Sequence, residues 1–105
     1  MAEIVKIGDA TLYLGDCMEV MADFQQNLVD MVLCDLPYGT TQNKWDSVIP
    51  LSDIWDAYDK ITKQNCAVVL TAAQPFTSAL VMSNIKNFKY CWVWDKVNRP
   101  TGHLN

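Results

Sequence analysis

Four consecutive residues, Asp35-Leu36-Pro37-Tyr38, combine side-chain types that could do chemistry. They follow an apolar run, residues 29–34, and precede a polar segment, residues 39–46. The carboxylate can accept hydrogen bonds from an amine, the proline stiffens the backbone, and the aromatic ring offers a stacking surface. The tetrapeptide is therefore suited to holding a flat heterocycle and binding its exocyclic amine. A purely structural interpretation stands beside this one, because an Asp with a proline after it often ends a strand and a nearby Tyr often packs in the core.

The surrounding sequence predicts the strands and helices that must position the tetrapeptide. Alternating apolar residues predict strands, apolar residues three and four apart predict helices, and Asp16, Pro50 and Pro75 are typical residues for helix starts. The expected elements are a hairpin over residues 3–14 with a turn at Gly8-Asp9, a helix over 17–24, a strand over 29–34, a helix over 50–61, a strand over 66–70, a helix over 75–85 and a strand over 88–94.

Strands that alternate with helices imply an α/β fold with a mostly parallel sheet flanked by helices, preceded here by the N-terminal hairpin. The runs 29–34 and 66–70 are almost continuously apolar, so we expect both strands to be buried on both faces. A chain of 105 residues is enough for one domain. Ligands of such sheets bind beyond the carboxyl ends of the strands. The polar residues at these ends are therefore expected to share one edge: Asp16, Asp35, Thr71 and Asp95.

Charge and composition restrict the classes of protein to which the chain can belong. Half of the residues are apolar, which is typical of a globular protein and not of a disordered one. Eight basic and twelve acidic residues leave a net charge of −4, which disfavours a free-standing nucleic-acid-binding domain. Charged residues make up only 19% of the chain, too few for an acidic mimic of DNA.

The cysteines predict free thiols in a reducing compartment. Cys17, Cys34, Cys66 and Cys91 form no C-x-x-C pair, and most lie in or beside apolar runs. We therefore expect buried free thiols, with no metal site and no disulfide. The sequence shows no charged-then-apolar leader and no run long enough to cross a membrane, so we expect a cytoplasmic protein without a membrane partner.

The tetrapeptide and the loop after it closely resemble the D-P-P-Y motif region of amino-methylating DNA methyltransferases, in particular phage-like members. The resemblance extends over nearly all of the chain and implies a partial Rossmann-like methyltransferase fold. Members of this family transfer a methyl group from S-adenosylmethionine to adenine N6 or cytosine N4. Leu36 stands where most relatives have proline, as in similar phage-type sequences. Asp at the first position favours adenine N6 by resemblance.

The resemblance implies a role for each residue of the motif. Asp35 and the carbonyl of Leu36 would accept the two N–H bonds of the target amine, which directs the nitrogen lone pair to the methyl group. Pro37 would stiffen the turn, and Tyr38 would stack on an adenine flipped out of double-stranded DNA.

Other segments resemble weaker motifs of the family. Asp16 lies in a segment that is near the cofactor in relatives, so cofactor binding is expected at Asp16 and Asp35. The aromatic run over residues 90–96 resembles a segment that lines the pocket for the flipped base. Each segment has a structural alternative, because Gly-Asp often starts a helix, alternating aromatic residues are often core, and exposed lysines are often only solvated. The residues expected to contact the target base or DNA, besides Tyr38, are Lys44, Trp45, Trp92, Trp94, Lys96 and Arg99.

One part of the family pattern is absent from the sequence. No F-x-G-x-G segment, which cradles the cofactor in relatives, follows the catalytic motif, and no target-recognition region follows it either. We therefore expect residues 1–105 to form a single incomplete catalytic domain, inactive alone and of doubtful cofactor affinity. A sheet with unpaired edges favours association. The expected partner is a second copy, or a second chain that supplies the missing half.

Two other functions remain open. The chain could be a methyltransferase-like binding protein that occupies a methyltransferase or restriction subunit. A methyltransferase acting on RNA or on a protein amide would use closely similar motifs, but the loop over residues 39–46 favours DNA by resemblance.

Overall fold

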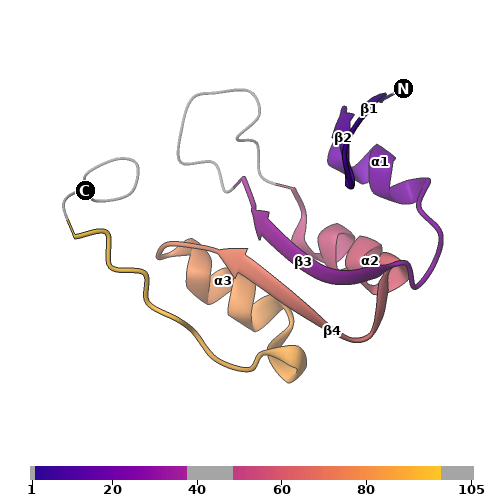
Figure 1. Cartoon of the computed structure of the whole chain (residues 1–105). Coiled ribbons are helices and arrows are strands. Elements are labelled where there is room, and N and C mark those ends of the chain that lie inside the picture. Colours follow the sequence, from indigo (N-terminus) through magenta and orange to yellow (C-terminus); the bar gives the residue numbers. More distant parts are fainter. Residues whose placement is uncertain (1, 38–48, 98–105) are drawn as a thin grey trace.

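The computed structural model describes residues 2–37 and 49–97. Within these residues the chain forms small sheets and short helices (Figure 1). The elements are β1 (Glu3–Ile7), β2 (Ala10–Leu14), α1 (Cys17–Ala22), β3 (Val29–Asp35), α2 (Leu51–Ile61), β4 (Thr62–Thr71), α3 (Phe76–Ser83) and the 3₁₀ helix η2 (Ile85–Asn87). The protein is therefore mixed α/β, as the sequence predicts.

The N-terminal hairpin is confirmed. Strands β1 and β2 pair antiparallel, from Glu3 opposite Leu14 to Ile7 opposite Ala10. Gly8 takes a positive φ of 58° in the turn, a conformation that glycine adopts without steric cost. The Tyr13 ring lies 5.5 Å from the Phe24 ring, centroid to centroid, which joins the hairpin to the segment after α1.

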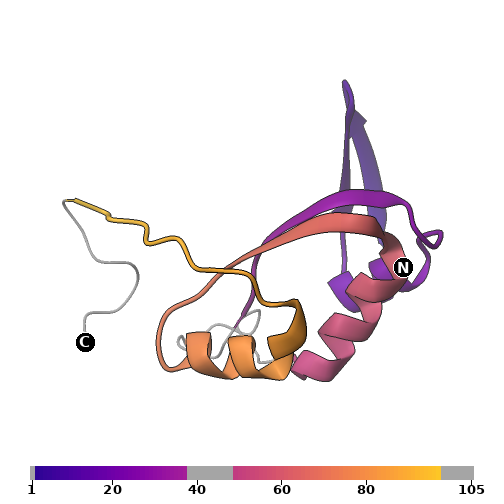
Figure 2. The same cartoon turned by 90° about the horizontal axis from the view of Figure 1, so that it is seen from below.

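Strands β3 and β4 form a parallel pair, and helices α2 and α3 lie on one face of it (Figure 2). Helix α2 presents Ile54, Tyr58 and Ile61 as a buried stripe, at a spacing of four and three residues. Ile54 and Tyr58 pack with Leu36, which follows β3, and with Leu80 of α3. These four side chains are the core that joins the parallel pair to its helices.

Helix α1 contacts both this core and helix α2. Its residues Met18 and Met21 pack on the core cluster. The Lys60 ammonium donates a 2.6 Å hydrogen bond to the carbonyl of Ala22 at the end of α1. The segment that enters β3 is bonded to the same end of α2, since the Leu28 amide donates to the Ile61 carbonyl.

The expectation that β3 and β4 are buried on both faces is wrong. Alternate residues of each strand face the helices, and the residues between them lie on an open face. On this open face the side chains of Leu33 and Met31 are 71% and 52% exposed, and Val69 is 44% exposed. The physical reason is that the described helices cover only one side of the pair, so half of the apolar residues have nothing to pack on.

The expected last strand, residues 88–94, is also absent from the described part of the chain. Residues 88–97 run away from the sheet and its helices (Figure 2). Among described residues, no backbone hydrogen bond joins the stretch 89–97 to β4 or β3. The alternation of aromatic residues suits a strand, but a strand exists only where a partner strand satisfies its backbone.

Two helices also end earlier than expected. Helix α1 ends at Ala22, before Phe24, and α3 ends at Ser83, where η2 takes over after one residue. Helix starts agree better, because Pro50 and Pro75 immediately precede α2 and α3. The prolines therefore predict the helix starts better than the apolar pattern predicts the helix ends.

Ile54 is the most deeply buried residue of the core, at 2% exposed. We expect Ile54→Ala to lower the free energy of unfolding by about 2–5 kcal/mol, because it removes packed methyl groups and leaves a cavity. Chemical denaturation followed by circular dichroism measures this change. Ile4→Ala is the control at a 61% exposed position of β1. An equal loss in both variants would contradict the described core.

Candidate functional site at the ends of the parallel strands

The backbone alternation of β3 separates the residues of the tetrapeptide. Asp35, the last residue of β3, is exposed and belongs to the open face together with Leu33. The next residue, Leu36, is 5% exposed and packs in the core. Pro37 is partly buried. The core thus holds the backbone at Leu36 in place, and the Asp35 carboxylate faces solvent beside it.

Thr71 is a polar neighbour that holds this carboxylate. It is the last residue of β4 and pairs with Asp35 in the register of the parallel strands. Its hydroxyl donates a 2.6 Å hydrogen bond to Asp35 Oδ1, a short distance typical of a hydroxyl bonded to a carboxylate. No other hydrogen bond to Asp35 occurs among the described residues. The sequence predicts Thr71 at this edge, but its bond to Asp35 depends on the register, which only the structure provides.

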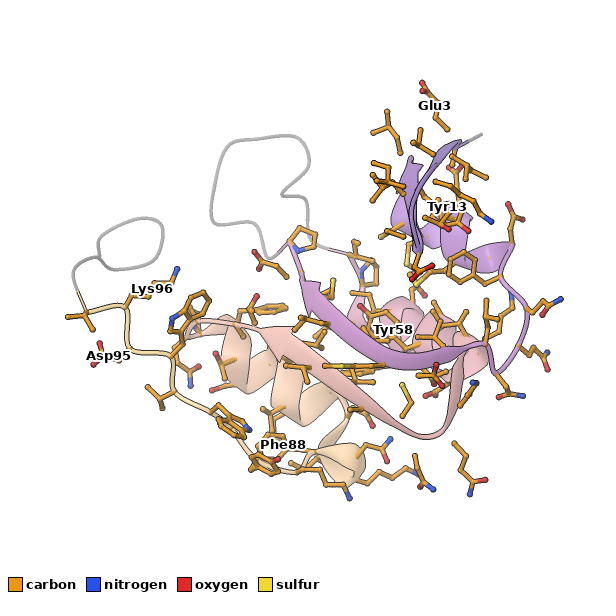
Figure 3. The ribbon with its side chains drawn as sticks, in the orientation of Figure 1. Glu3, Tyr13, Tyr58, Phe88, Asp95 and Lys96 are labelled. Atoms are coloured by element: carbon orange, nitrogen blue, oxygen red, sulfur yellow. The ribbon has the colours of Figure 1, made fainter. Side chains whose placement is uncertain are left out.

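The other two residues expected at this edge lie elsewhere. Asp16 follows β2, which belongs to the hairpin and not to the parallel pair. Its Oδ1 accepts a 2.8 Å hydrogen bond from the Met18 amide, so its carboxylate caps α1. Asp95 lies on the extended C-terminal segment (Figure 3), because the strand that would have placed it at the edge is absent. The expectation of one edge shared by all four residues is therefore wrong for these two.

The aromatic residues expected to line a base pocket are on this extended segment. Trp92 and Trp94 are 84% and 74% exposed, and Lys96 Nζ lies 4.5 Å from the centroid of the Trp94 ring. The Tyr90 and Trp92 rings are 6.1 Å apart, centroid to centroid. The structure brings Trp94 and Lys96 together, but no described contact joins the segment to Asp35. A role in base or DNA contact stays a prediction for Trp92, Trp94 and Lys96.

The thiols are free, as expected, but they are not buried. Cys17 and Cys91 are exposed, and Cys34 and Cys66 are partly buried. Partial burial, the Asp16 carboxylate and the Cys34 thiol raise the pKa of Cys17, so this thiol stays protonated at neutral pH. It is therefore a poor nucleophile.

Tyr58 lies beneath β3, on the side of α2 (Figure 3). Burial, and then the Cys34 thiol beside it, raise the pKa of Tyr58. Its phenol thus stays neutral and serves the core. The candidates for binding a polar ligand are therefore Asp35 and Thr71 at the strand ends, and not Tyr58 in the core.

Little else in the described residues suits a cofactor or metal. No group of three or more His, Cys, Asp or Glu side chains in residues 2–37 and 49–97 could hold a metal ion. A shallow concavity lies on the hairpin, away from Asp35, and is lined by Glu3, Val5, Leu12, Tyr13 and Leu14. Within the described ranges, no helix has the length and apolar character needed to cross a membrane.

Four residues expected in the site lie outside the described residues: Tyr38, Lys44, Trp45 and Arg99. Their expected roles stay predictions.

Comparisons with known proteins were made against family models, curated proteins and solved structures. No family model matches the chain, and no curated protein or solved structure matches it either. The site must therefore be interpreted from its own residues.

The capping bond of Asp16 gives a direct test of its structural role. We expect Asp16→Ala to lower the free energy of unfolding by about 1 kcal/mol, because the Met18 amide loses its acceptor. Chemical denaturation measures the loss. Asp16→Asn is the matched control, since an Asn side chain also caps helices, and it should be nearly neutral. A large loss in Asp16→Asn would show that the negative charge, and not the cap, is what matters.

Proposed function

We propose that Asp35 and the adjacent backbone form the amine-binding part of an S-adenosylmethionine-dependent DNA methyltransferase that acts on adenine N6. The proposal includes a partial Rossmann-like fold, of which the β3–β4 pair and its helices would be a part. One observation carries it. An exposed carboxylate lies at the carboxyl ends of paired parallel strands, where ligands of such sheets bind, and a neighbouring hydroxyl holds it.

The chemistry that this arrangement supports is the orientation of an amine. Among the described residues no hydrogen bond is made to Asp35 Oδ2, the proposed acceptor of one N–H bond of an exocyclic amine, and the Leu36 carbonyl is the proposed acceptor of the other. Two acceptors on the N–H bonds direct the nitrogen lone pair away from the protein, towards a methyl donor. Holding the two reactants in line supplies much of the remaining rate enhancement.

The described residues do not form a cradle for the cofactor. Asp16 is engaged as a helix cap, and the concavity on the hairpin lies away from Asp35. The proposed function includes a second copy or a second chain that supplies the surface that binds the cofactor.

Methyl transfer from labelled S-adenosylmethionine to unmethylated duplex DNA tests the proposal. The chain is assayed at high concentration, alone and with an amino-methyltransferase inactivated at its own motif aspartate. We expect transfer in at least one of these mixtures, and we expect Asp35→Ala to reduce it by about 10²-fold or more.

Asp30→Ala is the matched control for this assay. Asp30 is another exposed carboxylate of β3, and its described partner is Lys63, at 2.8 Å. This variant should leave transfer unchanged. Transfer that survives Asp35→Ala, or no transfer in any mixture, would contradict the proposed function.

The open face of the parallel pair favours a second candidate, a binding protein that docks on a methyltransferase or restriction subunit. Exposed apolar side chains on one face, beside two strand edges that no described strand pairs with, are typical of a docking surface. Such a protein would need Leu33 but not the Asp35 carboxylate.

A binding titration with a purified amino-methyltransferase subunit tests this second candidate. We expect Leu33→Lys to weaken binding by about tenfold or more, because it places a charge in the apolar contact. Ile4→Lys is the control, a similarly exposed apolar residue on the hairpin. Equal effects of the two variants would exclude the open face as the docking surface.

A further inference from the structure

The hydrogen bond between Thr71 and Asp35 restricts what this site can offer a ligand. A threonine hydroxyl has a single hydrogen, and a carboxylate has acceptor positions only. The hydrogen of Thr71 is directed to Asp35 Oδ1, at 2.6 Å. What remains on both side chains is a set of acceptors: Oδ2 of Asp35 and the free lone pairs of the Thr71 oxygen.

The geometry of this pair is held by the strands and not only by the bond itself. Asp35 and Thr71 are register partners, and the two preceding pairs, Cys34 with Leu70 and Leu33 with Val69, continue the same parallel ladder. The threonine side chain is β-branched, which restricts its rotation about χ1. On the other side of Asp35, the buried Leu36 fixes the backbone. Both partners are therefore positioned before any ligand arrives.

We propose that Thr71 is a positioning residue that holds the Asp35 carboxylate in the orientation in which it selects an amino group over an oxygen at the same place on a ring. This inference rests on the proposed function, because it requires Asp35 to contact the ligand. An exocyclic amine brings two hydrogens to a surface of acceptors. An ether or carbonyl oxygen brings only lone pairs, which face those of Asp35 and Thr71 without a hydrogen between them.

Asp35→Asn tests whether the preference for an amine depends on the carboxylate. In Asp35→Asn, the Thr71 hydroxyl can donate to the amide oxygen or accept from the amide NH₂, so it does not fix which of these two groups faces the ligand. The side chain then no longer presents acceptors only, and the preference for an amine should fall to near one.

The experiment measures binding to two DNA duplexes by fluorescence polarisation, with the chain alone and in the mixtures of the methyl-transfer assay. Each carries one test base opposite an abasic site, which lowers the cost of flipping the base out. The bases are adenine and 6-methoxypurine, which keeps N1 as an acceptor and carries an ether oxygen in place of the amine. The quantity compared among variants is the ratio of the two affinities, so the bulk of the methoxy group cancels.

We expect the unaltered chain to prefer adenine by about tenfold, the effect of one hydrogen bond to a charged group. Thr71→Val should reduce this preference to about two- to threefold, because the carboxylate stays an acceptor but loses the hydrogen bond that orients it. Thr71→Ser, which keeps the hydroxyl, should retain the preference. Asp35→Asn should reduce the preference to near one, and adding Thr71→Val to Asp35→Asn should change it no further. Thr11→Val, at an exposed threonine of β2, is the control and should behave as the unaltered chain.

A second measurement needs no ligand. The carboxyl carbon resonance of Asp35 should shift in Thr71→Val and stay nearly unchanged in Thr71→Ser and Thr11→Val. A packing role for Thr71 would change stability without this pattern.

The outcomes separate the inference from the function on which it rests. Binding with an adenine preference that Thr71→Val leaves intact overturns the inference alone, as does an unshifted Asp35 resonance. Failure of the unaltered chain to bind either duplex, alone and in every one of these mixtures, overturns the proposed function and the inference together.

Discussion

The structure depends most on the burial of Leu36 at the end of β3. This side chain packs against Ile54, Tyr58 and Leu80, which come from two helices, so one residue ties the strand to both. Because successive side chains of a strand point to opposite faces, burial of Leu36 requires the Asp35 carboxylate to face outward. Leu36, the residue after the strand, thus positions the candidate site through its packing.

The parallel pairing of β3 and β4 supplies the second constraint. It brings two chain segments separated by helix α2 to the same edge, with Asp35 opposite Thr71. The sequence gives no sign that this hydroxyl and this carboxylate meet, because 36 residues separate them. Their meeting follows from the register, and the register follows from which residues of each strand pack on the helices.

The layer of helices on a single side explains the exposed apolar side chains of β3 and β4. The open face of the parallel pair and the extended segment after η2 both carry large apolar side chains in contact with solvent. In an α/β protein such surfaces are usually covered by further helices or paired with further strands. In the described residues, the open face and the outer edges of the β3–β4 pair have no such cover or partner strand.

The sequence by itself determined the local structure. The turn at Gly8, the cap at Asp16 and the prolines before α2 and α3 act within a few residues, so their effects could be read directly. The tetrapeptide could also be placed at a strand end. Tertiary structure alone decided which faces are covered, that residues 88–94 form no strand, and that Thr71 and not Asp16 or Asp95 accompanies Asp35. The physical reason is that a strand and a buried face exist only with a partner, and the partner lies far away in the sequence.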